Sequence, residues 1–174
     1  GLLPDQEWKE KYKKEVWYIG DTYHASIGQG DISITPLQLA VATAAVANGG
    51  IVYQPQVVDR IIGESKEVVQ DIFPKILQQN FVDQKILEIV KKGMYLVTQP
   101  SGTAVKLSQL PVKVGAKTGT AQPGKIAAPH SWITVIAPLE KPELVIVILI
   151  ENGGGEKASP VTPVAYDILD WYFK

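Results

Sequence analysis

The architecture of this chain is set largely by residues 112–151, VKVGAKTGTAQPGKIAAPHSWITVIAPLEKPELVIVILIE. Three apolar segments, residues 112–121, 132–137 and 144–151, are separated by turns at Pro123-Gly124 and Glu140-Lys141-Pro142. Such segments predict strands, and strands with short connections are usually antiparallel neighbours. We therefore expect a three-stranded antiparallel meander, in which the apolar run 144–150 is a buried strand.

Helices are predicted on both sides of this segment in the sequence. Residues 34–48 have Thr35 as N-cap, Pro36 in the first turn and a stop at Asn48-Gly49-Gly50. Apolar residues surround much of this helix, which predicts packing on more than one side. Further helices are predicted at 83–98, capped by Asp83, and at 161–173. For the last one, Ser159 or Thr162 is the expected cap.

The rest of the chain gives weaker signals. The β-branched residues on either side of Gly63-Glu64-Ser65 predict a hairpin of strands 56–62 and 66–71. In residues 1–18 the apolar residues recur with no sustained period, and this segment is interpreted as an exposed connector. The expected fold is α/β, with a mostly antiparallel sheet flanked by helices, and a single domain is the economical interpretation.

Bulk composition excludes several function classes. The chain has 174 residues, a net charge of −1 and a pI near 6.2, with no basic stripe, so no nucleic-acid partner is expected. Cysteine is absent, which excludes thiol nucleophiles, cysteine zinc sites and disulfides. The longest apolar run is far shorter than the ~20 residues of a membrane helix.

The motif Lys117-Thr118-Gly119-Thr120 carries the chemistry. Strand alternation places Thr118 and Thr120 on one face, so that two hydroxyls can converge on a carboxylate. Gly119 removes a side chain where a ligand backbone could approach, and such a strand can bind a peptide by edge pairing. Lys117 adds a cation that can hold a neighbouring hydroxyl in its reactive state. The alternative is an ordinary edge strand with a solvated lysine.

Other candidate sites favour structural interpretations. Gly28-Gln29-Gly30 lacks the third glycine and the preceding strand of a dinucleotide loop, so a turn is favoured. His24 and His130 lack metal-ligand spacing, and no metal or cofactor is expected. His130 opens the strand after KTGT and could line the cleft, but a structural hydrogen bond is favoured. Ser131 is expected to be a small buried hydroxyl.

The surroundings of the motif resemble a known family. KTGTAQ followed by His130-Ser131-Trp132 and Ala137-Pro138, and LIENGGG at 149–155, resemble penicillin-binding proteins. Upstream, WYIGD at 17–21, SIGQG at 26–30, TPLQLA at 35–40 and ANGG at 47–50 resemble the elongation-type class B enzymes of the penicillin-binding protein 2 subgroup. The resemblance covers about the whole chain and implies a partial transpeptidase fold of the penicillin-binding protein and serine β-lactamase type.

The family uses three motifs, SxxK, SxN and KTG, and only KTG occurs here. No serine of this sequence has lysine three residues later or asparagine two residues later: Ser26, Ser33, Ser65, Ser101, Ser108, Ser131 and Ser159. The chain therefore contains no nucleophile. Residues 1–174 are interpreted as the C-terminal portion of a transpeptidase domain whose SxxK and SxN segments are expected upstream, and the isolated chain is expected to be inactive.

The resemblance also implies roles for the motif residues. Lys117 would position the nucleophile and SxN hydroxyls, while Thr118, Gly119 and Thr120 would bind the ligand and its carboxylate. The main-chain N–H of Thr120 would form half of an oxyanion hole. The implied activity of the parent protein is that of a serine D,D-transpeptidase, which cross-links peptidoglycan through an acyl-enzyme and binds β-lactams.

Partners and location follow from the same resemblance. The expected partners are the D-Ala-D-Ala stem peptide, β-lactams, the N-terminal part of the domain and a polytopic glycan polymerase. The expected location is the extracytoplasmic, periplasmic face of the cytoplasmic membrane, with an anchor outside this chain. Alternatives are a non-catalytic β-lactam sensor or scaffold, a part of a bifunctional class A enzyme, and a serine β-lactamase, against which the WYIGD, SIGQG and TPLQLA segments argue.

Overall fold

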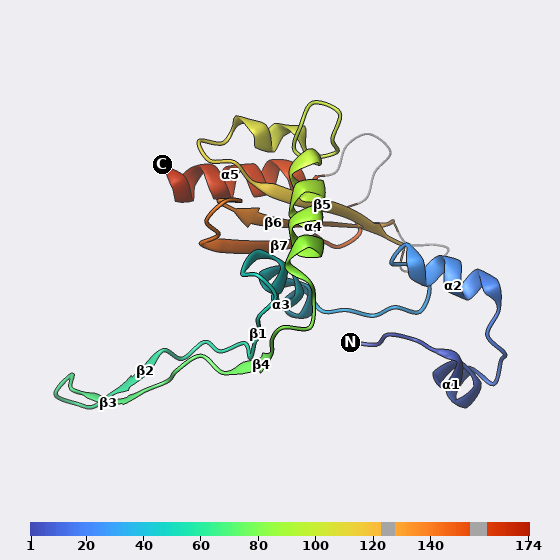
Figure 1. The fold of residues 1–174 in the computed structure, drawn as a ribbon, viewed down its shortest axis with the longest axis horizontal. Coiled ribbons are helices and arrows are strands. Elements are labelled where there is room, and N and C mark those ends of the chain that lie inside the picture. The colour runs from blue at the N-terminus through green and yellow to red at the C-terminus, as the bar shows by residue number, and fades with distance from the viewer. Residues whose placement is uncertain (123–127, 154–159) are drawn as a thin grey trace.

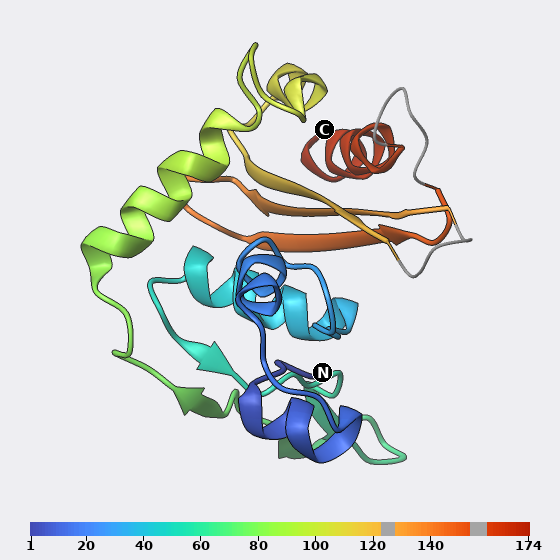
Figure 2. The same cartoon turned by 90° about the vertical axis from the view of Figure 1, so that its right-hand side faces the viewer.

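The computed structural model describes residues 1–122, 128–153 and 160–174. Its centre is a sheet with strand order β5 (Gly115–Ala121), β6 (His130–Ala137) and β7 (Leu144–Ile150), and both pairs are antiparallel. Helix α5 (Val161–Phe173) covers one face, while α3 (Pro36–Ala47) and α4 (Gln84–Leu96) lie on the other (Figures 1 and 2). The predicted α/β fold and antiparallel meander are confirmed. The predicted turn at Pro123-Gly124 lies outside the described residues.

The core lies on both faces of the central strand β6. Because side chains alternate along a strand, Ile133 and Val135 face α5, whereas Ile136 packs with Ala47 and Met94 on the other side. All three β6 residues are completely buried, and each is worth about 1.5–3 kcal/mol relative to an exposed position. The core therefore fixes the sheet between its helices, and with it the position of β5.

Helix α3 begins as its sequence predicts. Thr35 accepts a hydrogen bond from the N–H of Gln38, whose side chain returns to the backbone N–H of Thr35, and Pro36 occupies the first turn. The helix contacts β6, β7, α4 and the short strand β1 (Val52–Tyr53), so it packs on more than one side. Its apolar surface is only partly covered, however, because Leu37 remains 60% exposed.

The other two helices also match their predicted ranges, but one expected cap is wrong. Asp83 caps α4 by accepting from the N–H of Lys85. Helix α5 begins after Pro160 without a side-chain cap, and Thr162 is a buried residue inside the helix. The hydroxyl of Thr162 cannot cap because it lies in the α5 core, and Ser159 lies outside the described residues. No described helix is both long and apolar enough to cross a membrane.

The predicted hairpin exists but has shorter strands. Strands β2 (Arg60–Ile62) and β3 (Val68–Asp71) pair antiparallel and project from the body of the molecule (Figure 1). A second pair, β1 with β4 (Ile76–Gln78), lies at the base of the hairpin and was not predicted. Its strands are too short to show an alternating pattern in the sequence.

The N-terminal region contains more structure than a connector. Helix α1 (Gln6–Trp8), a π-helical turn η1 (Lys9–Lys13) and α2 (Ile19–Ser26) precede α3. None of the residues in α2 is buried. Its sequence therefore lacks the apolar residues at helical spacing from which most helices are predicted. The 3₁₀ turn η2 (Val105–Gln109), which packs against α5, was missed as well.

Strand β7 departs from its predicted burial. All seven residues of LVIVILI are only half-buried, because β7 lies at an edge of the described sheet. Uninterrupted apolar strands are typical of positions inside a sheet that is covered on both faces. The sequence of β7 thus suits an internal strand better than an edge.

Candidate active-site strand and its cleft

The KTGT motif lies on the other edge strand, β5, whose outer side is open among the described strands. The side-chain Nε2 of Gln29 donates to the Thr120 carbonyl over 2.6 Å. Since Gln29 lies outside the sheet, this carbonyl points away from β6. In an antiparallel ladder the N–H and C=O of one residue point to the same side. The Thr120 N–H therefore also faces the open edge, as an oxyanion-hole donor must.

The side chains of the motif lie on the two faces of β5. The strand pairs one-to-one with β6 from Gly115 to Ala121, so its alternation is regular. Ala116 is in the core under α5, and therefore Thr118 and Thr120 lie on that face. Lys117 lies on the opposite face, toward α3 and α4. The predicted same-face threonines are confirmed, and the lysine and the hydroxyls flank one open edge.

A cavity of about 530 Å³ runs along this edge. This volume is within the range of small-molecule sites, about 300–1,000 Å³. The cavity lies between the KTGT strand, the start of β6 and the loop that follows α2. Its polar lining includes the following residues: Gln29, Ser33, Lys117, Thr118, Thr120, Gln122, His130 and Thr134.

Lys117 also borders a second cavity, of about 510 Å³, between α3, α4 and the sheet. The walls of this groove are mainly apolar and include Val46, Val90 and Met94. The Nζ of Lys117 donates to the carbonyl of Thr118 at 2.5 Å. The ammonium group therefore lies at the junction of the apolar groove and the KTGT cavity.

The hydroxyl of Thr118 has a partner that the sequence did not reveal. Its Oγ1 lies 2.7 Å from the Oγ1 of Thr103, in the loop after α4. Gly102 makes this loop possible, because a Cβ there would lie 2.0 Å from the carbonyl oxygen of Val97. Thr103 can donate to Thr118 while the Thr118 hydroxyl donates to a ligand, so it orients the hydroxyl without blocking it.

Gln29 was interpreted as part of a turn, and the turn is confirmed. Helix α2 ends in a Schellman motif: the N–H of Gln29 donates to the carbonyl of His24, and the N–H of Gly28 to that of Ala25. Gly28 has φ +73°, a value that favours glycine. What the sequence did not show is that this turn delivers the Gln29 side chain to β5, because that contact spans 91 positions.

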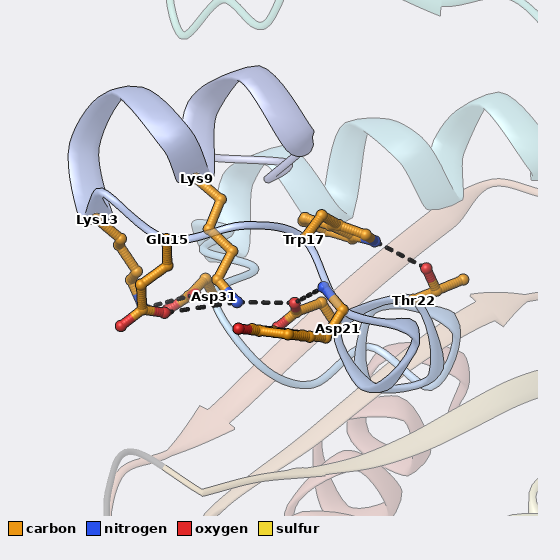
Figure 3. A network of polar contacts seen from close by, with 8 residues as sticks. Lys9, Lys13, Glu15, Trp17, Asp21, Thr22 and Asp31 are labelled. Atoms are coloured by element: carbon orange, nitrogen blue, oxygen red, sulfur yellow. Dashed lines mark hydrogen bonds and ion pairs between the residues drawn. The ribbon is translucent and has the colours of Figure 1, made fainter.

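A polar network holds α2 in place (Figure 3). Lys9, only 5% exposed, pairs with Asp21 at 2.7 Å, and Asp21 also accepts from the N–H of Tyr18. The hydrogen bond between the two side chains lowers the pKa of Asp21 and raises the pKa of Lys9. A second ion pair joins Lys13 to Asp31, just beyond the Gln29 turn. These contacts tie the N-terminal region to α2 and its turn.

The remaining predictions for this region concern His130, Ser131 and Gly119. The Nδ1 of His130 accepts from the N–H of Asn152 at 3.0 Å, and Ser131 is buried, so both structural interpretations are confirmed. His130 also lines the KTGT cavity, as the alternative interpretation of this residue expected. A Cβ at Gly119 would meet only the Cβ of Trp132, at 3.5 Å. Internal packing therefore does not require glycine at this position, and the open space remains available to a ligand.

Comparison with known proteins identifies the family. Residues 3–170 match the penicillin binding protein transpeptidase domain, and the chain belongs to this family. It is 34% identical to the peptidoglycan D,D-transpeptidase MrdA of Haemophilus influenzae and 35% identical to that of Escherichia coli, in each case over 98% of this chain. The chain spans 28% and 29%, respectively, of these two relatives.

Solved structures agree with the fold. PBP2 of Pseudomonas aeruginosa, in complex with WCK 5153, matches 99% of this chain with a TM-score of 0.79 and 32% identity, over 36% of its own length. PBP2 of Helicobacter pylori matches 99% with a TM-score of 0.78 and 31% identity, over 30% of its length. An imipenem acyl-enzyme complex of penicillin-binding protein A from Mycobacterium tuberculosis matches 87% with a TM-score of 0.75 and 26% identity, over 33% of its length.

Proposed function

We propose that residues 1–174 are the C-terminal portion of the transpeptidase domain of a serine D,D-transpeptidase that cross-links peptidoglycan stem peptides and is acylated by β-lactams. The observation that carries this proposal is the position of KTGT on an open edge strand beside a cavity of about 530 Å³. An extended ligand can pair with such an edge. The relatives named as D,D-transpeptidases support the reaction class.

Each motif residue then has a defined task. Thr118 and Thr120 donate hydroxyl hydrogen bonds to the ligand carboxylate, and the hydroxyl of Thr103 supports that of Thr118. Gly119 leaves room for the ligand backbone. The Thr120 N–H donates to the oxyanion that forms when the nucleophile attacks. Lys117 holds the nucleophile and SxN hydroxyls in position and favours the developing negative charge.

The nucleophile itself must come from a segment outside these 174 residues, since no serine here has the SxxK or SxN pattern. Two surfaces of this chain could bind a segment that carries the nucleophile. The apolar groove beside Lys117 can receive a helix, which would place a hydroxyl near the Lys117 ammonium. The open edge of β7 can accept a further strand. We assign both surfaces to the N-terminal part of the same domain.

A non-catalytic sensor or scaffold is the second candidate, because the chain itself lacks a nucleophile. The two candidates differ in one observable. A transpeptidase completed with SxxK and SxN segments releases D-alanine from a stem-peptide substrate, whereas a sensor remains acylated or unreactive. A bifunctional class A enzyme would in addition polymerise glycan strands, and an assay of the parent protein measures that activity.

Location and partners follow from the proposed reaction. Peptidoglycan is assembled outside the cytoplasm, so we propose a periplasmic or other extracytoplasmic location and a membrane anchor elsewhere in the parent protein. A polytopic glycan polymerase is the proposed source of uncross-linked strands. The PBP2 of H. pylori has been solved in a complex with MreC, and we propose an MreC-like protein as a further partner.

The carboxylate-binding role predicts the effect of removing one hydroxyl at a time. In the completed enzyme, Thr118→Val or Thr120→Val keeps a β-branched residue of similar volume and removes one charge-assisted hydrogen bond. We expect acylation by benzylpenicillin to slow by about tenfold to a hundredfold, which corresponds to about 1.5–3 kcal/mol. Ser65→Ala, on the exposed hairpin, is the control. If both threonine variants are acylated at the parental rate, Thr118 and Thr120 do not bind the ligand carboxylate.

The incomplete sheet predicts the behaviour of the isolated chain in solution. Uncovered apolar surface at the α3–α4 groove and an unpaired β7 edge favour association. We expect residues 1–174 alone to self-associate and to bind a hydrophobic dye, and both properties should disappear when the N-terminal part is joined to it. Sedimentation velocity and dye fluorescence measure this. A monodisperse monomer with a cooperative melt and no dye binding would show that the domain is complete without a further segment.

A further inference from the structure

We propose that Gln29 is a specificity-determining residue of the KTGT edge: its side-chain amide competes with the amide N–H of an acyl donor for the carbonyl oxygen of Thr120. The inference rests on the proposed function and adds to it a residue outside the KTGT motif. The proposed competition affects the acylation rates of two chemical classes of acyl donor differently. One class has an amide N–H that can pair with this carbonyl, and the other has none.

The contact occupies the place where a ligand strand pairs. Gln29 Nε2 lies 2.6 Å from the Thr120 oxygen, a short distance for this kind of hydrogen bond. Strand β6 fills one side of β5, so Gln29 and any added strand reach Thr120 from the same open side. Both also lie in the same cavity, because Gln29 lines it together with Thr118 and Thr120.

Gln29 is held there by structure outside the KTGT strand. The Schellman motif of α2 fixes its backbone through the N–H of Gln29 and the carbonyl of His24, which are 2.9 Å apart. Helix α2 is in turn tied to the N-terminal region by the Lys9–Asp21 ion pair, and the turn by Lys13–Asp31. Because the backbone of Gln29 is already fixed, the hydrogen bond to Thr120 costs only the rotamer freedom of one side chain. Gln29 is therefore an effective competitor for the carbonyl.

The ligand chemistry follows from the geometry of edge pairing. A peptide added antiparallel to β5 donates a main-chain N–H to the Thr120 carbonyl and accepts from the Thr120 N–H. A peptidyl acyl donor carries such an amide beside its reacting carbonyl, and so does benzylpenicillin in its side chain. Imipenem carries a hydroxyethyl group there and has no amide to donate. Only the amide-bearing class has to displace Gln29.

The test uses the completed transpeptidase with Gln29→Ala, and Gln70→Ala on β3 as the matched control. Second-order acylation rate constants are measured for benzylpenicillin and for imipenem. Removing a competing neutral hydrogen bond should raise the benzylpenicillin rate constant by about two- to tenfold, with less than a twofold change for imipenem. The control should leave both rate constants unchanged.

Three results would overturn the proposal. Equal acceleration of both drugs would mean that Gln29 restrains the site in general, and unchanged rates would mean that the contact does not compete. Slower acylation by both would make Gln29 a support of the strand. Failure of the proposed function is distinguishable, because in that case the completed protein with Gln29 intact would not be acylated by either drug.

Discussion

Lys117→Met in the completed transpeptidase is expected to slow acylation by β-lactams on the order of 10²–10³-fold. Methionine keeps an unbranched side chain of similar length but removes the ammonium group. That group lies where the apolar groove meets the KTGT cavity, bonded to the Thr118 carbonyl. Lys117 is exposed in the 174-residue chain, but in the completed protein the proposed N-terminal part covers the groove, and charges act more strongly in such a covered site than in solvent. The effect should therefore exceed that of either threonine substitution.

The control is Lys141→Met, in the exposed turn between β6 and β7. This substitution removes the same charge from a position without an assigned role. The variant should be acylated at the parental rate. Melting temperatures of both variants check that folding is intact. If Lys117→Met is folded and acylates at the parental rate, KTGT is an ordinary edge strand, and the roles proposed for its residues are wrong.

The main elements could be predicted because their signals are local. Helix α3 carries its own start and stop, in Thr35, Pro36 and the Asn48-Gly49-Gly50 sequence, and the structure uses all of them. The strands β5, β6 and β7 are long apolar segments with short connections, and they pair in chain order. The same-face position of Thr118 and Thr120 follows from strand alternation alone. These features depend on residues within a few positions of one another.

What could not be predicted depends on contacts between distant residues. Helix α2 has no buried face and is fixed instead by Lys9 and Asp21, twelve positions apart. The hydroxyl pair of Thr103 with Thr118 and the bond from Gln29 to Thr120 also join separate segments. Ser, Thr and Gln are common surface residues, so nothing in their local sequence indicates that they reach the KTGT strand.

The misjudged burial of β7 has a different cause. Its uninterrupted apolar composition is typical of a strand inside a sheet that is covered on both faces. The described residues supply a neighbour on one side only, and its side chains therefore remain half-buried. Sequence and structure thus differ only in the neighbours of β7. Like the lack of SxxK and SxN motifs in this chain, this difference supports the proposal that a further segment of the domain packs here.

Residues 1–174 alone are expected to show no covalent labelling by a fluorescent penicillin. Acylation needs a serine hydroxyl activated by a neighbouring lysine, and no serine of this chain is followed by lysine three residues later. In the proposed site the Thr120 N–H is only half of an oxyanion hole, so the chain alone would lack both the nucleophile and the complete stabilisation of the transition state. The loss should be complete within the sensitivity of gel fluorescence.

The most direct measurement locates the adduct. The chain alone, and the same chain joined to an SxxK- and SxN-bearing N-terminal part, are incubated with benzylpenicillin and analysed by intact mass and by peptide mass spectrometry. We predict no adduct on the chain alone. For the joined protein we predict one penicilloyl group, attached to the SxxK serine outside residues 1–174. An adduct on any serine within residues 1–174, or none on the joined and folded protein, would contradict the account.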